Sequence, residues 1–200
     1  MNNFGLFASP WWVNLLILMP LLAFFYFRKT SLSITKTQLL VAAIFGIAFG
    51  FVEAAVVIYL RAASGLLPGY MQSLSEAAKQ SNGVYWQIQT LNSLPKSLFT
   101  IEFYRNAASI IMLLSIAWLS VKGLKERVAM FLWVFSAWDI FYYVGLWLTI
   151  RWPNSLTTPD ILFLIPVPWV SQVWYPLLVS GLTMLAVGVC VNDSHEPVLK

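Results

Sequence analysis

Histidine and cysteine are almost absent from this sequence, with one residue of each, His195 and Cys190. A single cysteine excludes a disulfide within the chain and supplies too few thiolates for a metal site. His195 lies in the polar segment VNDSHEPVLK, so no histidine is available inside an apolar segment to ligate haem, zinc or non-haem iron. We therefore expect no cofactor of these kinds and interpret Cys190 as a small buried hydrophobe.

Charged residues are also scarce. They make up 10% of the 200 residues, whereas 60% are hydrophobic and the mean hydropathy is +0.75. A soluble domain contains roughly 25% charged residues, so this composition predicts a polytopic membrane protein. The net charge is only +4, and the basic residues are spread over short loops, so nucleic-acid binding has no support.

Five apolar segments each have close to the ~20 residues that a helix needs to cross the bilayer. They cover residues 11–27, 38–60, 98–120, 128–150 and 174–191. The first is followed, not preceded, by Arg28 and Lys29, which is the reverse of a secretory signal and predicts a retained helix. The predicted fold is an all-α, integral membrane helical bundle of five transmembrane helices in a single domain, residues 1–200.

The basic residues predict the orientation of this bundle. One set of loops, with the C-terminal tail, contains seven of them, and the opposite set contains four. The richer set comprises Arg28, Lys29, Lys36, Lys122, Lys125, Arg127 and Lys200, and the poorer set Arg61, Lys79, Lys96 and Arg151. Because basic loops stay in the cytoplasm, the N-terminus is predicted outside and the C-terminus inside. A bacterial cytoplasmic membrane is the expected location.

Two long connections, residues 61–97 and 151–173, fall on the predicted outer side. The second is apolar for a loop, but its four prolines, Pro153, Pro159, Pro166 and Pro168, disfavour a straight helix. It is predicted to form a re-entrant or interfacial cap over the outer mouth of the bundle.

Four ionisable residues lie inside the apolar segments: Glu53, Glu102, Arg105 and Asp139. A charge at the bilayer centre costs about 2.5 to 3.5 kcal/mol on insertion scales, so such residues usually face protein or a water-filled cavity. Glu102 and Arg105 are three residues apart and therefore share a helix face. Ser136, Asp139 and Tyr143 share another face, and the Tyr143 hydroxyl is a suitable partner for a buried carboxyl.

The second segment also indicates which way Glu53 points. Gly46 and Gly50 form a small-xxx-small pair, and Glu53 continues the same stripe about two turns after Gly46. This pattern predicts that Glu53 faces another helix, while the glycine face would serve an internal contact or a dimer equally well. At 1.5 Å per residue, Glu53 lies about 12 Å below the outer boundary, and Glu102 and Arg105 about 6 to 11 Å below it. All four ionisable residues are thus predicted to line one crevice in the outer half.

Three hypotheses for function remain open at this point. In the first, the crevice binds an amphiphilic or anionic small molecule, for transport or in an accessory subunit of a membrane complex; the candidate ligand-binding residues are Arg105, Tyr143, Arg61, Arg151 and Asp160. In the second, the protein is a lipid-modifying or lipid-hydrolysing enzyme whose candidate catalytic residues are Glu53, Glu102 and Asp139, with Arg105 holding the head group. In the third, the protein is a structural subunit, and its charged residues form ion pairs that hold the helices together.

Cofactor and partner predictions follow from the same residues. The carboxylates of Glu53, Glu102 and Asp139 have the oxygen ligands that Mg²⁺ prefers. The expected partners are membrane lipids, a small amphiphile, and either further copies of the chain or other membrane subunits. No sequence motif identifies a substrate, so whether the protein is an enzyme stays undecided.

Overall fold

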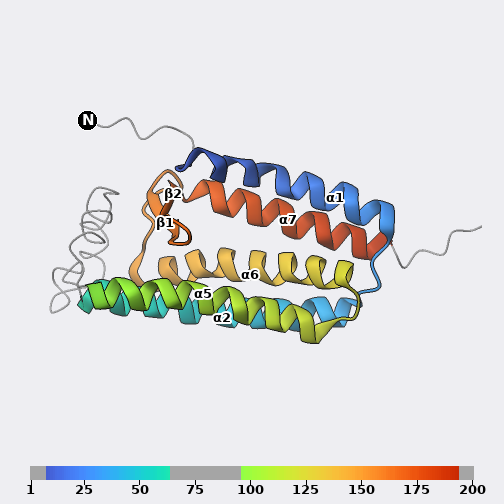
Figure 1. The fold of residues 1–200 in the computed structure, drawn as a ribbon, viewed down its shortest axis with the longest axis horizontal. Helices are drawn as coiled ribbons and strands as arrows, with labels where there is room; N and C mark the ends of the chain where they lie inside the picture. The colour runs from blue at the N-terminus through green and yellow to red at the C-terminus, as the bar shows by residue number, and fades with distance from the viewer. Residues whose placement is uncertain (1–7, 64–95, 194–200) are drawn as a thin grey trace, which may run out of the picture.

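The computed structural model describes residues 8–63 and 96–193, and this part of the chain contains five helices long and apolar enough to cross a membrane. The first begins as a 3₁₀-helix, η1 (Trp11–Leu18), and continues as α1 (Met19–Thr30). The others are α2 (Lys36–Ala63), α5 (Lys96–Ser120), α6 (Leu124–Ile150) and α7 (Trp174–Asp193). The helices run along the long axis of the molecule (Figure 1). The predicted helical bundle and its five spans are confirmed.

Successive spans run in opposite directions, which sorts their connections into two groups. The α1–α2 and α5–α6 connections and the C-terminal end of α7 lie at one end of the bundle (Figure 1). The other end, which we call the hairpin end, carries the C-terminal end of α2, the N-terminal end of α5 and residues 151–173. The two groups are the same sets of loops that the basic residues distinguish in the sequence.

Residues 151–173 contain a β-hairpin that the sequence did not predict. Strands β1 (Pro159–Phe163) and β2 (Trp169–Gln172) pair antiparallel, with Asp160 opposite Ser171. A further backbone pair joins Ser9 to Val170, with both hydrogen bonds at 2.8 Å. The segment does not cross the bundle and packs at its end, as expected for a cap. Its strands escaped prediction because both are short, and their pairing depends on residues on the far side of a proline-containing turn.

Helices α2 and α6 approach each other closely because glycines lie between them. A Cβ atom added at Gly46 would lie 2.8 Å from the carbonyl oxygen of Val134, and one at Gly50 would lie 2.6 Å from that of Trp138. Both contacts are to backbone atoms of α6, which cannot move aside as a side chain can. The glycine face of α2 therefore serves an internal contact, which decides between the two alternatives left by the sequence.

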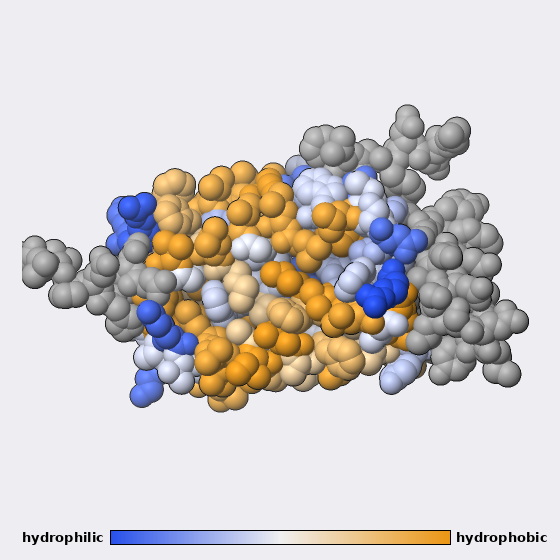
Figure 2. All heavy atoms as spheres, turned by 180° about the vertical axis from the view of Figure 1, so that it is seen from behind, coloured by the Kyte–Doolittle hydropathy of each residue, from blue (hydrophilic) through white to orange (hydrophobic). Residues whose placement is uncertain are grey.

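The surface of the bundle is apolar over its middle and polar towards both ends (Figure 2). Large hydrophobic side chains remain exposed on several helices, among them Phe25, Val41, Ile111, Leu119 and Leu185. A soluble protein rarely exposes such a continuous apolar surface, whereas hydrocarbon accepts it without cost. The chain is a multi-pass membrane protein.

Candidate functional site

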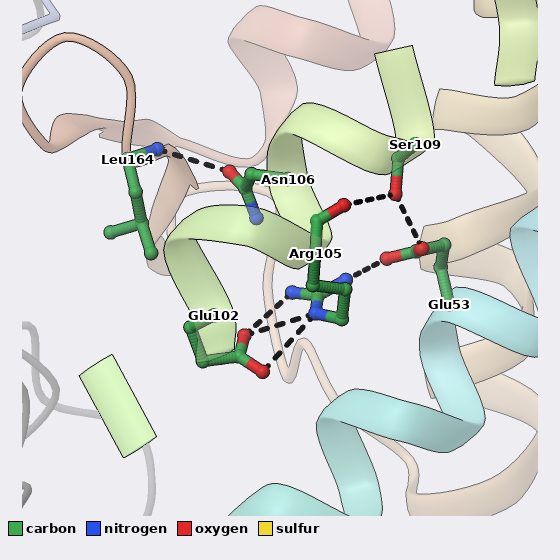
Figure 3. A network of polar contacts seen from close by, with 6 residues as sticks. All are labelled: Glu53, Glu102, Arg105, Asn106, Ser109 and Leu164. Atoms are coloured by element: carbon green, nitrogen blue, oxygen red, sulfur yellow. Dashed lines mark hydrogen bonds and ion pairs between the residues drawn. The ribbon is translucent and has the colours of Figure 1, made fainter. Parts of the chain in front are cut away.

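Arg105 on α5 joins carboxylates from two helices (Figure 3). Its Nε and Nη2 atoms donate to Glu102 Oε2 at 3.1 and 2.8 Å, and Nη1 pairs with the carboxylate of Glu53 on α2. Ser109, one turn further along α5, donates to the other oxygen of Glu53 at 2.6 Å. We call Glu53, Glu102, Arg105 and Ser109 the arginine cluster. It binds α2 to α5 through charged groups.

Helical spacing explains why α5 contributes three members of this cluster. Glu102, Arg105 and Ser109 follow at intervals of three and four residues, which places their side chains on one face of the helix. The two carboxylates are nearly inaccessible, with Glu53 5% and Glu102 6% exposed. The Arg105 side chain keeps 20% of its surface accessible. The two carboxylates of the cluster are therefore better shielded from hydrocarbon than the Arg105 side chain is.

The Arg105 guanidinium has more donors than these carboxylates use. One N–H group on each terminal nitrogen has no acceptor among the residues that the structure describes. Arginine has no acceptor function and stays charged, so each unused N–H group can still donate a hydrogen bond to an oxygen atom. The cluster can therefore hold one more polar group.

Asp139 lies in a separate polar layer between α6 and α7. Its Oδ2 atom accepts a hydrogen bond from Ser180 on α7 at 2.7 Å. Within residues 8–63 and 96–193, no hydrogen bond or ion pair joins Asp139 to the arginine cluster or to any lysine or arginine. The structure therefore shows two separate sets of polar contacts, one at the arginine cluster and one at Asp139, and the single crevice stays a prediction. Glu53 faces α5, whereas the face of α6 that carries Asp139 is turned towards α7.

Tyr143 and Asp160 connect the hairpin to the bundle. The Tyr143 hydroxyl donates to Asp160 Oδ2 at 2.9 Å, and both residues are buried. Tyr143 thus bonds to a buried carboxyl as expected, although that carboxyl comes from the cap. Asn106 on α5 provides a second attachment, because its side-chain oxygen accepts the backbone N–H of Leu164 at 3.1 Å (Figure 3).

Of the two remaining candidate arginines, Arg151 makes no contact with this site among the described residues. Arg151 ends α6 in a left-handed conformation, φ 57°, and its guanidinium lies 4.5 Å from the ring centre of Trp147 at the exposed rim. Arg61 belongs to α2, but its side chain lies outside the described residues.

The proposed magnesium ligands belong to two different sets of contacts: Glu53 and Glu102 pair with Arg105, and Asp139 bonds to Ser180. Residues 8–63 and 96–193 contain no group of three or more His, Cys, Asp or Glu side chains that could hold a metal ion. Arg105 lies between Glu53 and Glu102, and Asp139 belongs to the other polar layer. The structure thus gathers no three-carboxylate group from Glu53, Glu102 and Asp139 among the described residues, and their roles in Mg²⁺ binding and in catalysis stay predictions.

Sequence reasoning missed Asn106 and the α7 hydroxyl of Ser180, which turn out to be direct partners of the hairpin and of Asp139. Asn106 lies on the same face of α5 as Glu102, so helical spacing could have indicated it. Ser180 carries no such signal, because isolated hydroxyl residues are common in apolar helices.

No protein-family model matches this chain, and no curated protein or solved structure is significantly similar to it.

Proposed function

We propose that this protein binds an amphiphilic molecule at the hairpin end of the bundle, as a transporter or as an accessory subunit of a membrane complex. The head group would bind at Arg105, and the apolar part would lie along α5. One observation carries the proposal: inside a membrane-spanning helix, the Arg105 side chain is 20% exposed and has donors that no described residue uses.

The charge of the arginine cluster limits the head group. Glu53 and Glu102 both pair with Arg105, so the cluster has two acidic groups for one basic group. A head group with several negative charges would be repelled by this acidic excess. A neutral polar or zwitterionic head group, which offers an oxygen to the free N–H groups, fits better than the strongly anionic ligand that the sequence also allowed.

The surroundings of Arg105 suit the rest of such a molecule. Ile101 and Tyr104, on the same helix, are 59% and 67% exposed and present apolar surface to the membrane. An amphiphile that diffuses in the bilayer could therefore reach the arginine sideways, with its chains on α5 and its polar group at the cluster.

The distribution of basic residues supports an orientation for this site. The connections at the end opposite the hairpin contain the larger set, Arg28, Lys29, Lys36, Lys122, Lys125 and Arg127. By the positive-inside rule, the hairpin end would face the outside of a bacterial cytoplasmic membrane, with the N-terminus outside and the C-terminus inside. The ligand would then come from the outer leaflet.

Mass spectrometry of the protein purified in native lipid particles tests the proposal. The wild type should retain an amphiphile enriched over the surrounding lipid, and Arg105→Gln should reduce that enrichment about tenfold, equivalent to about 1.4 kcal/mol. Arg151→Gln, a change at the same end outside the cluster, is the matched control and should retain the molecule. Absence of enrichment in the wild type, or equal enrichment in Arg105→Gln, would refute the proposal.

A second candidate function is that of a structural subunit in which the arginine cluster holds α5 against α2. Only 17% of the α5 span is buried inside the bundle, compared with 50% of the α6 and α7 spans. Because so little of α5 is buried, its attachment to the bundle depends strongly on the ion pair between Arg105 and Glu53. In this case Glu53→Gln would lower the unfolding temperature, and no amphiphile would be enriched on the wild type.

A further inference from the structure

The layer between α6 and α7 contains a carboxylate without a cationic partner. Asp139 lies near the middle of α6, and its one hydrogen-bond partner among the described residues is the neutral hydroxyl of Ser180. An ionised carboxylate at this depth is costly unless a positive charge compensates it. Among the described residues, no lysine or arginine forms an ion pair with Asp139.

Two further buried hydroxyls lie on the same two helices, each three residues from Asp139 or Ser180. Ser136 is 1% exposed and Thr183 is 0% exposed, and neither side-chain oxygen has a hydrogen-bond partner among the described residues. Other helical hydroxyls in this chain donate to the carbonyl four residues earlier, as Ser115 and Thr149 do, both at 2.7 Å. Ser136 and Thr183 make no such bond and leave their oxygens available to another group.

The antiparallel arrangement of the helices brings these residues together. Ser136 precedes Asp139 by three residues on α6, and Thr183 follows Ser180 by three residues on α7. Both steps lead away from the hairpin end, by about 4.5 Å of helical rise. Because Asp139 and Ser180 are in contact, this spacing predicts that Ser136 and Thr183 lie in the next layer along the same two helices.

We propose that Asp139, Ser136, Ser180 and Thr183 form a binding site for a monovalent cation of the size of Na⁺. The site would supply one negative charge and several hydroxyl oxygens, which matches the charge and the ligand preference of such an ion. Ser180 can keep its hydrogen on Asp139 while its lone pairs face the cation. A divalent ion usually takes several carboxylates, and residues 8–63 and 96–193 hold no group of three or more His, Cys, Asp or Glu side chains that could bind a metal ion.

The hairpin end offers a polar approach to this site. Tyr143 lies one turn above Asp139 on α6, and its hydroxyl bonds to Asp160 of β1. The cation would therefore enter past the Tyr143–Asp160 contact. The inference goes beyond the proposed function and does not depend on an amphiphile at Arg105.

Thermal unfolding of the full-length protein in detergent tests the site. Sodium chloride should raise the unfolding temperature by a few degrees, in a saturable manner, relative to choline chloride at equal ionic strength and pH. Asp139→Asn should abolish the rise. Thr183→Val should diminish it without impairing folding, since the change removes a buried hydroxyl that has no described partner.

The matched control is Thr149→Val, because the Thr149 hydroxyl bonds to its own helix and lies outside the interface layer. It should retain the full sodium effect. Equal unfolding temperatures in sodium and choline, an unchanged sodium effect in Asp139→Asn or in Thr183→Val, or a dependence on pH alone would each overturn the cation site. Amphiphile retention at Arg105 is measured separately, so either proposal can fail without the other.

Discussion

At the scale of single residues, the hydroxyl groups of this bundle differ in what they bind. Ser115, Ser120 and Thr149 donate to carbonyls of their own helix. Ser180 reaches an acidic side chain on another helix, and Ser109 does so too, in addition to a 3.0 Å contact with the carbonyl oxygen of Arg105 on its own helix. A bond within one helix adds little to tertiary stability, whereas a bond to a buried carboxylate on another helix favours one particular pairing of helices.

The Ser109→Ala substitution should therefore destabilise the bundle. It removes the 2.6 Å hydrogen bond to Glu53 and leaves that carboxylate oxygen without its donor. We expect a loss of about 1.5 to 3 kcal/mol in the free energy of unfolding, the usual value for a hydrogen bond to a charged group. Unfolding in mixed micelles of increasing SDS content measures it.

Ser115→Ala is the control for this experiment, because the Ser115 hydroxyl is bonded only to its own helix. Its effect should stay within about 0.5 kcal/mol. Equal losses for the two variants would show that the contact between Ser109 and Glu53 does not stabilise the pairing of α2 with α5.

At the scale of elements, the five spans are attached by different means. Helices α2 and α6 meet backbone to backbone at Gly46 and Gly50. Helix α5 is tied to α2 by the arginine cluster, and the hairpin is tied to α6 by Tyr143. Close packing requires small residues and tolerates no added volume, whereas an ion-pair contact requires particular charges. The two kinds of contact thus fail under different substitutions.

The Gly50→Ala substitution should separate α2 from α6. Its new Cβ atom would lie 2.6 Å from the carbonyl oxygen of Trp138 and 2.9 Å from the backbone nitrogen of Tyr142, so the two backbones must move apart. We expect a destabilisation of about 1 to 3 kcal/mol, as for other overpacked sites. The same SDS titration measures it.

A second glycine provides the comparison. A Cβ atom added at Gly181 of α7 meets nothing within 4 Å, so Gly181→Ala should be neutral or stabilising by up to about 1 kcal/mol. If Gly50→Ala proved as stable as Gly181→Ala, the close α2–α6 contact would be refuted.

At the scale of the whole molecule, the bundle has two chemically different ends. The hairpin end carries buried acidic residues, among them Asp160. The opposite end carries exposed basic residues such as Lys29 and Lys122 in its short connections. Such an asymmetry is what the insertion machinery and the membrane potential act on, so it should determine the orientation of the protein.

Cysteine labelling of intact cells checks this orientation. In a Cys190→Ala background, a membrane-impermeant maleimide should label Asn154→Cys, which is exposed at the hairpin end. Lys122→Cys, exposed at the opposite end, should be labelled only after permeabilisation. The reverse pattern would invert the orientation, and labelling of both sites from outside would contradict the assignment of the two ends to opposite sides.

The sequence by itself determined the class of protein and the number of spans. Length and hydropathy of an apolar segment are local properties, and a helix of about 20 residues is the way in which a single segment crosses hydrocarbon with its backbone satisfied. Helical spacing also placed Glu102 and Arg105 on one face of α5, because residues three or four apart are neighbours on any helix.

Only the tertiary structure decided which faces meet. Spacing along one helix does not determine which neighbour that helix packs against, so the sequence could not show that Arg105 pairs with Glu53 while Asp139 turns to Ser180. The same holds for the contact of Gly50 with α6 and for the pairing of β1 with β2. The contacts between helices join residues far apart along the chain, and their selection depends on how all five helices share the available surface.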